Sequence, residues 1–156
     1  MQVHSVNSAT LTPVELAAWR GLLRVHGALV RELDAELRAT HDLSLHEYEV
    51  LLVLSQTPDG RMRMSHLAAA VLLSQSGLTR LVDRLARAGS VERTRCKDDR
   101  RGLNAELTGA GLSRLERARP THLASVRKSF LDQFDNAELG TLADLWERVL
   151  PGATAE

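Results

Sequence analysis

The sequence predicts a mainly α-helical protein that carries one small β-hairpin. Apolar residues recur at spacings of three and four through most of the 156 residues, as they do in helices that bury one face. Two short segments instead alternate apolar and polar residues, as strands do, and a polar turn separates them. Hydrophobic residues make up 44% of the chain and charged residues 26%, a balance that allows a folded core.

The first helix is predicted to begin abruptly after a flexible arm formed by residues 1–11. Thr12 can cap the helix, Pro13 suits its first position and Glu15 completes a capping box. Apolar residues then follow at helical spacing as far as Leu37, so one face is expected to be buried along the helix. A helix this long exceeds the needs of a small core. It therefore either pairs with a second chain or braces another long helix.

Shorter helices are predicted to follow. Ser44 opens the next one through a second capping box and the turn Pro58-Asp59-Gly60 ends it, after which residues 61–64 form a short alternating segment. Two more short helices come next: Ser65 is expected to cap a helix over residues 67–72, and Ser74 one that runs to about Ala88. Gly89 then supplies the usual signal for the end of a helix.

The two strands are predicted over residues 91–95 and 103–107, with a polar turn between them. Thr108 is expected to cap a long helix from about Gly109 to Phe134, with Pro120 as a kink. A third capping box, Asp135 to Glu138, then opens a final helix that stops at Pro151-Gly152.

The order of these elements is that of a winged helix–turn–helix lobe, which we assign to residues 44–108. The two short helices form the helix–turn–helix, and the hairpin forms the wing. The long helices over residues 12–43 and 109–150 flank this lobe and are assigned to dimerisation. The fold class is therefore mainly α with a small β-wing.

The charges of the chain are unevenly spread, although 20 basic and 20 acidic residues leave no formal net charge. Residues 61–101 hold 10 basic and 4 acidic side chains, a net charge of +6, whereas residues 1–60 and 102–156 carry −4 and −2. A local basic block is the electrostatic footprint of a module that binds duplex DNA. The alternatives are a solvated basic surface and a winged fold used for protein contacts.

The polar face of the second short helix suits the major groove of DNA. Small or polar side chains at its N-terminal end allow close approach to base edges, and Arg80 can reach guanine or a phosphate. Basic residues of the wing suit the flanking minor groove. The candidate DNA-binding residues are Ser74, Gln75, Ser76, Thr79, Arg80 and Arg84 in the helix and Lys97, Arg100 and Arg101 in the wing.

The central block resembles the MarR family of bacterial transcriptional regulators. The resemblance rests on Ser74-Gln75-Ser76-Gly77-Leu78-Thr79-Arg80-Leu81-Val82-Asp83-Arg84-Leu85 with Gly89 and Val91-Glu92-Arg93, and on Asp98-Asp99-Arg100-Arg101-Gly102 with Leu107-Thr108. It extends from about Leu11 to Leu150. It implies a homodimer of triangular outline, held by the first, fifth and last helices, that binds a pseudo-palindromic operator and acts as a repressor.

The resemblance also assigns roles in the wing. The family's Asp-x-Arg pattern falls on Asp99 and Arg101, where the acid is expected to brace the wing and an arginine at its tip to enter the minor groove. Because Arg100 and Arg101 are adjacent, the sequence leaves open which of the two inserts.

A small aromatic or phenolic effector that releases the DNA is a further implication of the resemblance. The expected pocket lies between the first two helices and the base of the fifth. Trp19 and His26, seven residues apart on one helical face, are the candidates to line it, with Tyr48 opposite. The alternatives are that Trp19 belongs to the core or to a dimer interface, and that His26 is an ordinary polar group.

No cofactor, metal site or catalytic site is predicted. The single cysteine, Cys96, lies at the wing beside Arg95 and Lys97, where we expect a passive role rather than redox sensing. The six histidines lack metal-binding spacing, and no motif of an enzyme's active site is visible. A small helical enzyme and an interaction module that does not bind DNA are the alternative functions.

A cytoplasmic location is expected. One cysteine fits a reducing compartment, and residues 1–11 have no signal-peptide pattern. The longest apolar run covers residues 67–73, far short of the roughly 20 residues that cross a bilayer. We therefore expect no membrane partner.

Overall fold

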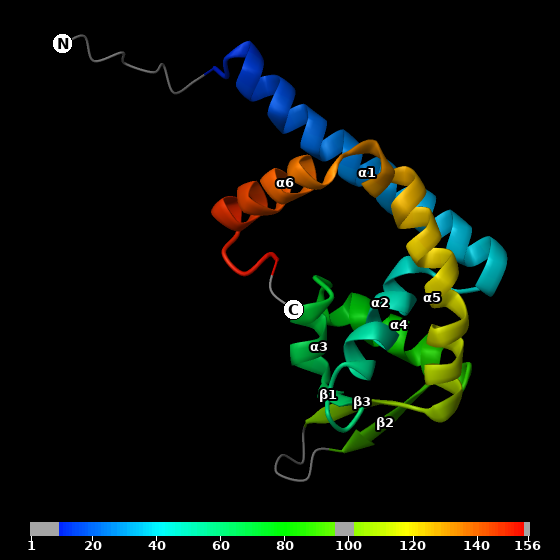
Figure 1. Cartoon of the computed structure of the whole chain (residues 1–156). Coiled ribbons are helices and arrows are strands. Elements are labelled where there is room, and N and C mark those ends of the chain that lie inside the picture. The colour runs from blue at the N-terminus through cyan, green and yellow to red at the C-terminus, as the bar shows by residue number, and fades with distance from the viewer. Residues whose placement is uncertain (1–9, 96–101, 155–156) are drawn as a thin grey trace.

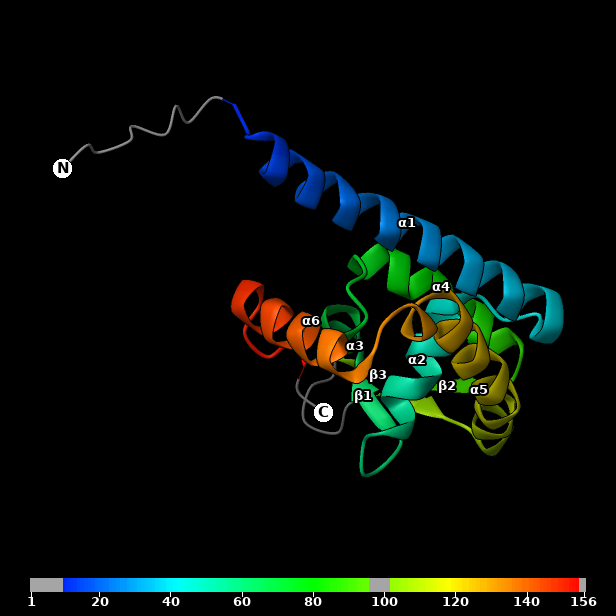
Figure 2. The ribbon, with the colours of Figure 1, turned by 45° about the horizontal axis from the view of Figure 1, so that its top comes forward.

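The computed structural model describes residues 10–95 and 102–154. The long helix α1 (Pro13–His41) runs above a compact lobe, and its N-terminal half projects beyond that lobe (Figures 1 and 2). Helix α5 (Gly109–Ser129) leads from the lobe back to α1. Helix α6 (Asn136–Val149) then turns back beneath the projecting half of α1.

The lobe holds three helices and a small sheet at its lower edge. Its helices are α2 (Leu45–Ser55), α3 (Met64–Ala70) and α4 (Gln75–Arg87). The strands β1 (Arg61–Arg63), β2 (Val91–Arg95) and β3 (Leu103–Leu107) form an antiparallel sheet in the order β1-β3-β2. The predicted hairpin is thus confirmed, and the alternating segment before it supplies the third strand. The mainly helical fold class with a small β-wing is confirmed as well.

Most of the predicted helix starts are confirmed. Capping boxes at Thr12, Ser44 and Asp135 each satisfy two backbone amides, one through the cap side chain and one through the glutamate three residues later. The side chains of Ser74 and Thr108 also cap their helices, although no second side chain completes a box there. These starts depend on contacts within four residues, which is why the sequence alone indicates them.

The predicted cap at Ser65 is wrong. Helix α3 begins at Met64, and its cap residue is Arg63, which makes no side-chain capping hydrogen bond. A cap residue needs an extended backbone, and the end of β1 already provides that conformation at Arg63. Ser65 is therefore inside the first turn of the helix.

The predicted end of the long helix at Phe134 is also wrong. Helix α5 continues through Pro120 but ends at Ser129, and Phe130 leaves the helical conformation. A single 3₁₀ turn, Leu131–Gln133, follows. The rings of Phe130 and Phe134 pack edge to face across this turn, with centroids 5.2 Å apart. The chain thereby reverses toward α6 instead of extending α5.

The buried core lies in the lobe, between α2, α4, the sheet and the adjoining parts of α1 and α5. Only Leu37 of α1 is buried, and no residue of α6 is. The fully buried leucines are Leu37, Leu43, Leu51, Leu54, Leu67, Leu78, Leu85 and Leu115. Within a single chain, the two helices above the lobe, α1 and α6, therefore leave most of their apolar residues uncovered.

Gly111 permits a close approach between α5 and the lobe. A Cβ atom at this position would overlap the carbonyl oxygen of Ser90 and come within 2.9 Å of Leu107 Cδ1. We expect Gly111→Ala to lower the free energy of unfolding by about 1–3 kcal/mol, because backbone atoms must move to make room. Gly109→Ala is the matched control, since nothing lies within 4 Å of a Cβ atom there. Chemical denaturation that gave equal stabilities for the two variants would contradict this packing.

Candidate nucleic-acid interface

Helix α4 presents a polar face because its other face is buried. Leu78, Leu81, Val82 and Leu85 pack into the core, which leaves the opposite side of the helix exposed. The Ser74 hydroxyl accepts a hydrogen bond from the Gly77 amide at 3.1 Å and caps the first turn. The exposed residues of the N-terminal half are Ser74, Gln75, Ser76, Thr79 and Arg80. The structure thus brings these five predicted DNA-binding residues together on one surface.

A polar pocket of about 340 Å³ lies beside this surface, between α3, α4 and the sheet. It contains two basic residues that the sequence analysis did not single out, Arg63 on β1 and Arg93 on β2. Both belong to the basic block of residues 61–101, so the sequence indicated their charge but not their position beside α4. The residues that line the pocket are Arg63, Met64, Ser65, Gln75, Thr79, Arg93, Gly102 and Leu103.

Two ion pairs tie α4 to its neighbours. Asp83 Oδ1 lies 3.2 Å from Arg93 Nη2 on β2, and Glu47 Oε1 on α2 accepts a hydrogen bond of 2.7 Å from Arg84 Nε. Burial acts to raise the pKa of the Glu47 carboxyl, but hydrogen bonds from Ser44 and the Arg84 guanidinium hold that pKa below its usual value. Arg84 is therefore engaged with a buried carboxylate, whereas Arg80 forms no ion pair within residues 10–95 and 102–154.

The wing tip lies outside the described residues. Strands β2 and β3 lead toward it, and the last described pair in their register is Arg95 with Leu103. The assignments made for Lys97, Asp99, Arg100 and Arg101, and the passive role expected for Cys96, therefore stay predictions.

The structure does not bring the three candidate effector residues together. Tyr48 is buried in the lobe, where its ring packs on His122 of α5 with centroids 4.4 Å apart, and burial raises the pKa of its hydroxyl against the opposing effect of Arg119. Trp19 is 53% exposed on the projecting half of α1. His26 borders an apolar pocket that neither Trp19 nor Tyr48 lines. The two aromatic residues lie apart because α1 extends past the lobe that contains α2.

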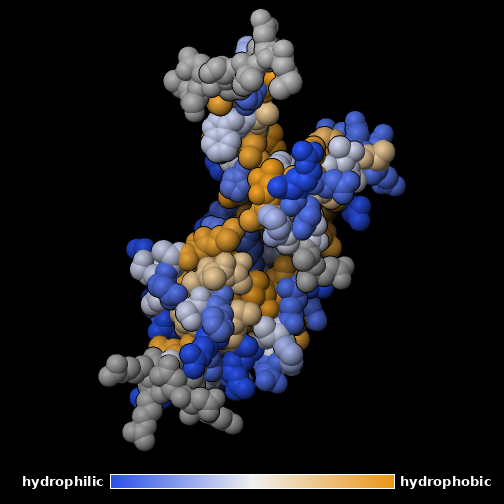
Figure 3. Space-filling model, turned by 90° about the vertical axis from the view of Figure 1, so that its left-hand side faces the viewer, coloured by the Kyte–Doolittle hydropathy of each residue, from blue (hydrophilic) through white to orange (hydrophobic). Residues whose placement is uncertain are grey.

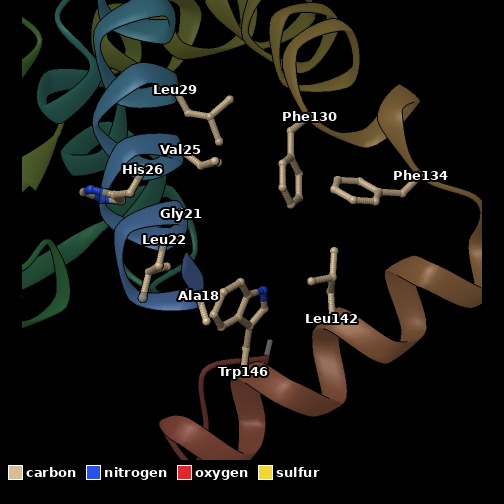
Figure 4. Close-up of a pocket in the computed structure, with 10 residues that line it drawn as sticks. All are labelled: Ala18, Gly21, Leu22, Val25, His26, Leu29, Phe130, Phe134, Leu142 and Trp146. Carbon is tan, nitrogen blue, oxygen red and sulfur yellow. The ribbon is translucent and has the colours of Figure 1, made fainter. Parts of the chain in front are cut away.

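The pocket that His26 borders is apolar and lies between α1, the turn after α5 and α6 (Figure 4). Its volume is about 350 Å³, and the His26 ring points away from its centre. Figure 3 shows apolar side chains exposed over the helices above the lobe. The lining residues are Ala18, Gly21, Leu22, Val25, His26, Leu29, Phe130, Phe134, Leu142 and Trp146.

The described part of the chain contains neither a metal-binding cluster nor a membrane-spanning helix. None of its residues form a group of three or more His, Cys, Asp or Glu side chains arranged to hold a metal ion. No helix within residues 10–95 and 102–154 is both long and apolar enough to cross a bilayer.

An exposed, capped helix set between a second helix and an antiparallel hairpin defines a winged helix–turn–helix protein. A sequence model of the MarR family matches residues 41–102. The HTH-type transcriptional repressor YetL of Bacillus subtilis is 32% identical over 114 residues, which are 71% of this chain and 68% of YetL.

Solved structures agree with this assignment. AbsC, a MarR family transcriptional regulator from Streptomyces coelicolor, matches with a TM-score of 0.83 at 38% identity, over 90% of this chain and 94% of AbsC. Sco3205, a MarR family regulator from the same organism in complex with DNA, matches with a TM-score of 0.86 at 30% identity, over 93% of this chain and 91% of Sco3205. The chain belongs to the MarR family, and it is a DNA-binding transcriptional regulator. The resemblance inferred from the sequence is therefore confirmed.

Proposed function

We propose that this regulator acts as a homodimeric repressor that binds a pseudo-palindromic operator. In each half-site the N-terminal half of α4 enters the major groove and the wing approaches the adjacent minor groove. The observation that carries the proposal is the exposed, capped N-terminal half of α4. Two relatives of the chain add support: YetL is named as a repressor, and Sco3205 was solved with DNA.

The side chains of α4 support direct contact with bases. Ser76 and Thr79 are small and polar, so the helix can approach base edges closely, and Arg80 can form a bidentate contact with guanine. Arg63 and Arg93 lie at the side of the same surface, where a basic group suits the phosphate backbone. The base contacts would then give specificity, and the phosphate contacts would fix the register.

The uncovered apolar surface supports a dimer. Trp19 and Leu23 continue the stripe of α1 that is packed against the core at Val30 and Leu37, but they lie beyond the lobe. A neighbouring stripe of α1, which includes Leu22 and Val25, faces α6 and is still partly exposed. Exposed apolar surface of this extent marks a contact with another molecule. The large apolar residues exposed on α1 and α6 are Val14, Trp19, Leu22, Leu23, Val25, Leu145, Trp146 and Val149.

A second copy of the chain is the partner that fits this surface. Both upper helices lack cover, and a two-fold axis would place the same surface on each subunit opposite its equivalent. Two recognition helices related by that axis match two half-sites about one turn of DNA, or a multiple, apart. The dimer therefore accounts for the helices above the lobe and for a palindromic operator together.

A small aromatic or phenolic effector completes the proposal. Support for an effector comes from the family resemblance, whereas support for this place comes from the apolar pocket between α1, the turn after α5 and α6, which is not the place that the resemblance implies. An apolar cavity with a few polar groups at its edge is the usual form of a small-molecule site. His26 borders that pocket, whereas Trp19 and Tyr48 do not. A ligand bound there would contact α1 and α6, the two helices that the dimer requires.

Arg80 is the residue that tests the DNA-binding surface. We expect Arg80→Ala to weaken binding to the selected operator by about 1–3 kcal/mol and to relax the preference at one base position. The operator is first selected from a random duplex library, and affinities are then measured by fluorescence anisotropy at fixed salt. Arg127→Ala, on α5 and outside the lobe, controls for the loss of one positive charge. Equal losses in the two variants would contradict the assignment of α4.

Leu145 tests the dimer. Its side chain is 42% exposed and does not line the pocket between α1 and α6, so a charge there should disturb only an intermolecular contact. We expect Leu145→Glu to weaken dimerisation by several kcal/mol, because the interface would bury an unpaired carboxylate. Asp144→Ala, at the neighbouring exposed position of the same helix, is the control. Sedimentation equilibrium that found the wild-type protein monomeric at micromolar concentration would refute the homodimer.

A further inference from the structure

Glu47 is the only Asp, Glu, Lys or Arg side chain that is buried in the described part of the chain, with 6% of its surface exposed. Its Oε2 atom accepts a hydrogen bond of 2.7 Å from the Ser44 amide, which completes the capping box of α2. Its Oε1 atom accepts the hydrogen bond from Arg84 Nε at 2.7 Å. Burial of a charge is costly unless the charge is paired and hydrogen-bonded. The ion pair with Arg84 therefore offsets the cost of burying the Glu47 carboxylate.

The other two capping boxes show that capping alone does not require this arrangement. Glu15 and Glu138 cap α1 and α6 in the same way, and both are exposed on the surface. Neither forms an ion pair among the described residues. The burial of Glu47 and its contact with α4 are therefore additional to its capping role.

Arg84 lies at the edge of the exposed face of α4, on the side next to α2. Its neighbour Asp83, about 100° further round the helix, contacts Arg93 of β2. Consecutive residues of α4 thus connect it to α2 and to the wing strand. Such a pair of contacts opposes rotation of the helix in either direction.

The α2 end of this connection is itself attached to α1. Asp34 Oδ1 accepts a hydrogen bond of 2.9 Å from the Leu45 amide, and its Oδ2 accepts one of 2.6 Å from Arg38 Nε. Asp34, the first turn of α2, Glu47 and Arg84 form a continuous polar connection from α1 to α4. This connection joins the long upper helix to the helix that faces the DNA.

We propose that Glu47 is a positioning residue for operator recognition, and that Arg84 acts through Glu47 rather than on the DNA. The proposal rests on the proposed binding of an operator by α4. It gives Arg84 a role different from that of Arg80, although both belong to the same polar face. It also gives a buried carboxylate of α2, which does not reach the DNA-facing surface, a part in sequence specificity.

A positioning role has a different signature from a phosphate contact. Base readout depends on the placement of α4, whereas contacts with phosphates are independent of sequence. Removal of a phosphate contact lowers the salt dependence of binding by about one unit in the log–log slope. Loss of positioning instead lowers the affinity for the operator while the salt slope and the affinity for unrelated DNA are kept.

The experiment compares Glu47→Gln, Arg84→Met and the double variant. Glutamine can still accept the Ser44 amide hydrogen bond, so the cap of α2 is preserved. Arg87→Met is the matched control, because Arg87 is exposed on the last turn of α4 and its Nε donates to the Asp83 carbonyl of its own helix. Anisotropy titrations over a series of salt concentrations use the selected operator and an unrelated duplex of equal length.

We expect each single variant to lose at least tenfold in operator affinity, the effect of removing a hydrogen bond between charged groups. The double variant should lose no more than the larger single loss, because both residues act through one contact. Salt slopes and affinities for the unrelated duplex should stay those of the wild type. A lower salt slope in Arg84→Met together with wild-type affinity in Glu47→Gln would overturn the proposal and make Arg84 a phosphate contact.

Amide hydrogen exchange without DNA separates this proposal from the proposed function. Both single variants should exchange faster than the wild type in the C-terminal half of α4, whereas Arg87→Met should not. Unchanged exchange in Glu47→Gln and Arg84→Met would overturn the positioning role. A wild-type protein that selects no duplex, while its variants show faster exchange, would refute operator binding but leave the attachment of α4 to α2 intact.

Discussion

Burial of one face of α4 is the interaction on which the rest of the structure depends. Leu78, Val82 and Leu85 have no exposed surface, and Leu81 has 8%. Burial of such a side chain is worth about 1.5–3 kcal/mol, so any large rotation of the helix would expose apolar surface at a cost that its polar contacts do not offset. The outward face of α4 is therefore determined by its inward face. The ion pairs of Asp83 and Arg84 act on a smaller scale, within an orientation that burial has already selected.

Helix α1 has a different constraint, because its apolar pattern is longer than the core of the lobe can cover. Its C-terminal part places Leu37 in the lobe, with Val30 and Leu33 packed against the same core. The stripe then continues to Trp19 with no change of period, although the lobe has ended (Figure 2). The part of the stripe near Trp19 is not covered by its own chain, since Trp19 is exposed and no residue of α6 is buried. The fold of the lobe therefore accounts for only part of the length of α1, and the proposed dimer would account for the rest.

The sequence predicts what depends on neighbouring residues and misses what depends on distant ones. The capping boxes and the hairpin are local patterns, and each lies where it was expected. The start of α3 and the end of α5 depend on β1 and on the packing of two phenylalanine rings, which spacing does not reveal. Tyr48 and Trp19 both match an effector site in composition, but only the fold shows that they are on different parts of the molecule. The contact of Glu47 with Arg84 spans 37 residues, so the sequence offers a capping box and a polar helix without their connection.

The junction of α1 and α2 is the place where dimer geometry and DNA recognition meet in the proposed assembly. Asp34 holds the first turn of α2, and Arg114 of α5 donates to the carbonyl of Asp42 in the connecting turn. With α4 attached to the same junction through Glu47, the lobe has to follow α1 as one body. A change in the angle between the two α1 helices of a dimer would then alter the spacing of the recognition helices without any rearrangement of the lobe core. An effector can act on such a system only if it binds one dimer geometry more tightly than the other. A ligand in the proposed site between α1 and α6 would contact two helices of the proposed interface, and its affinity would therefore depend on the dimer geometry.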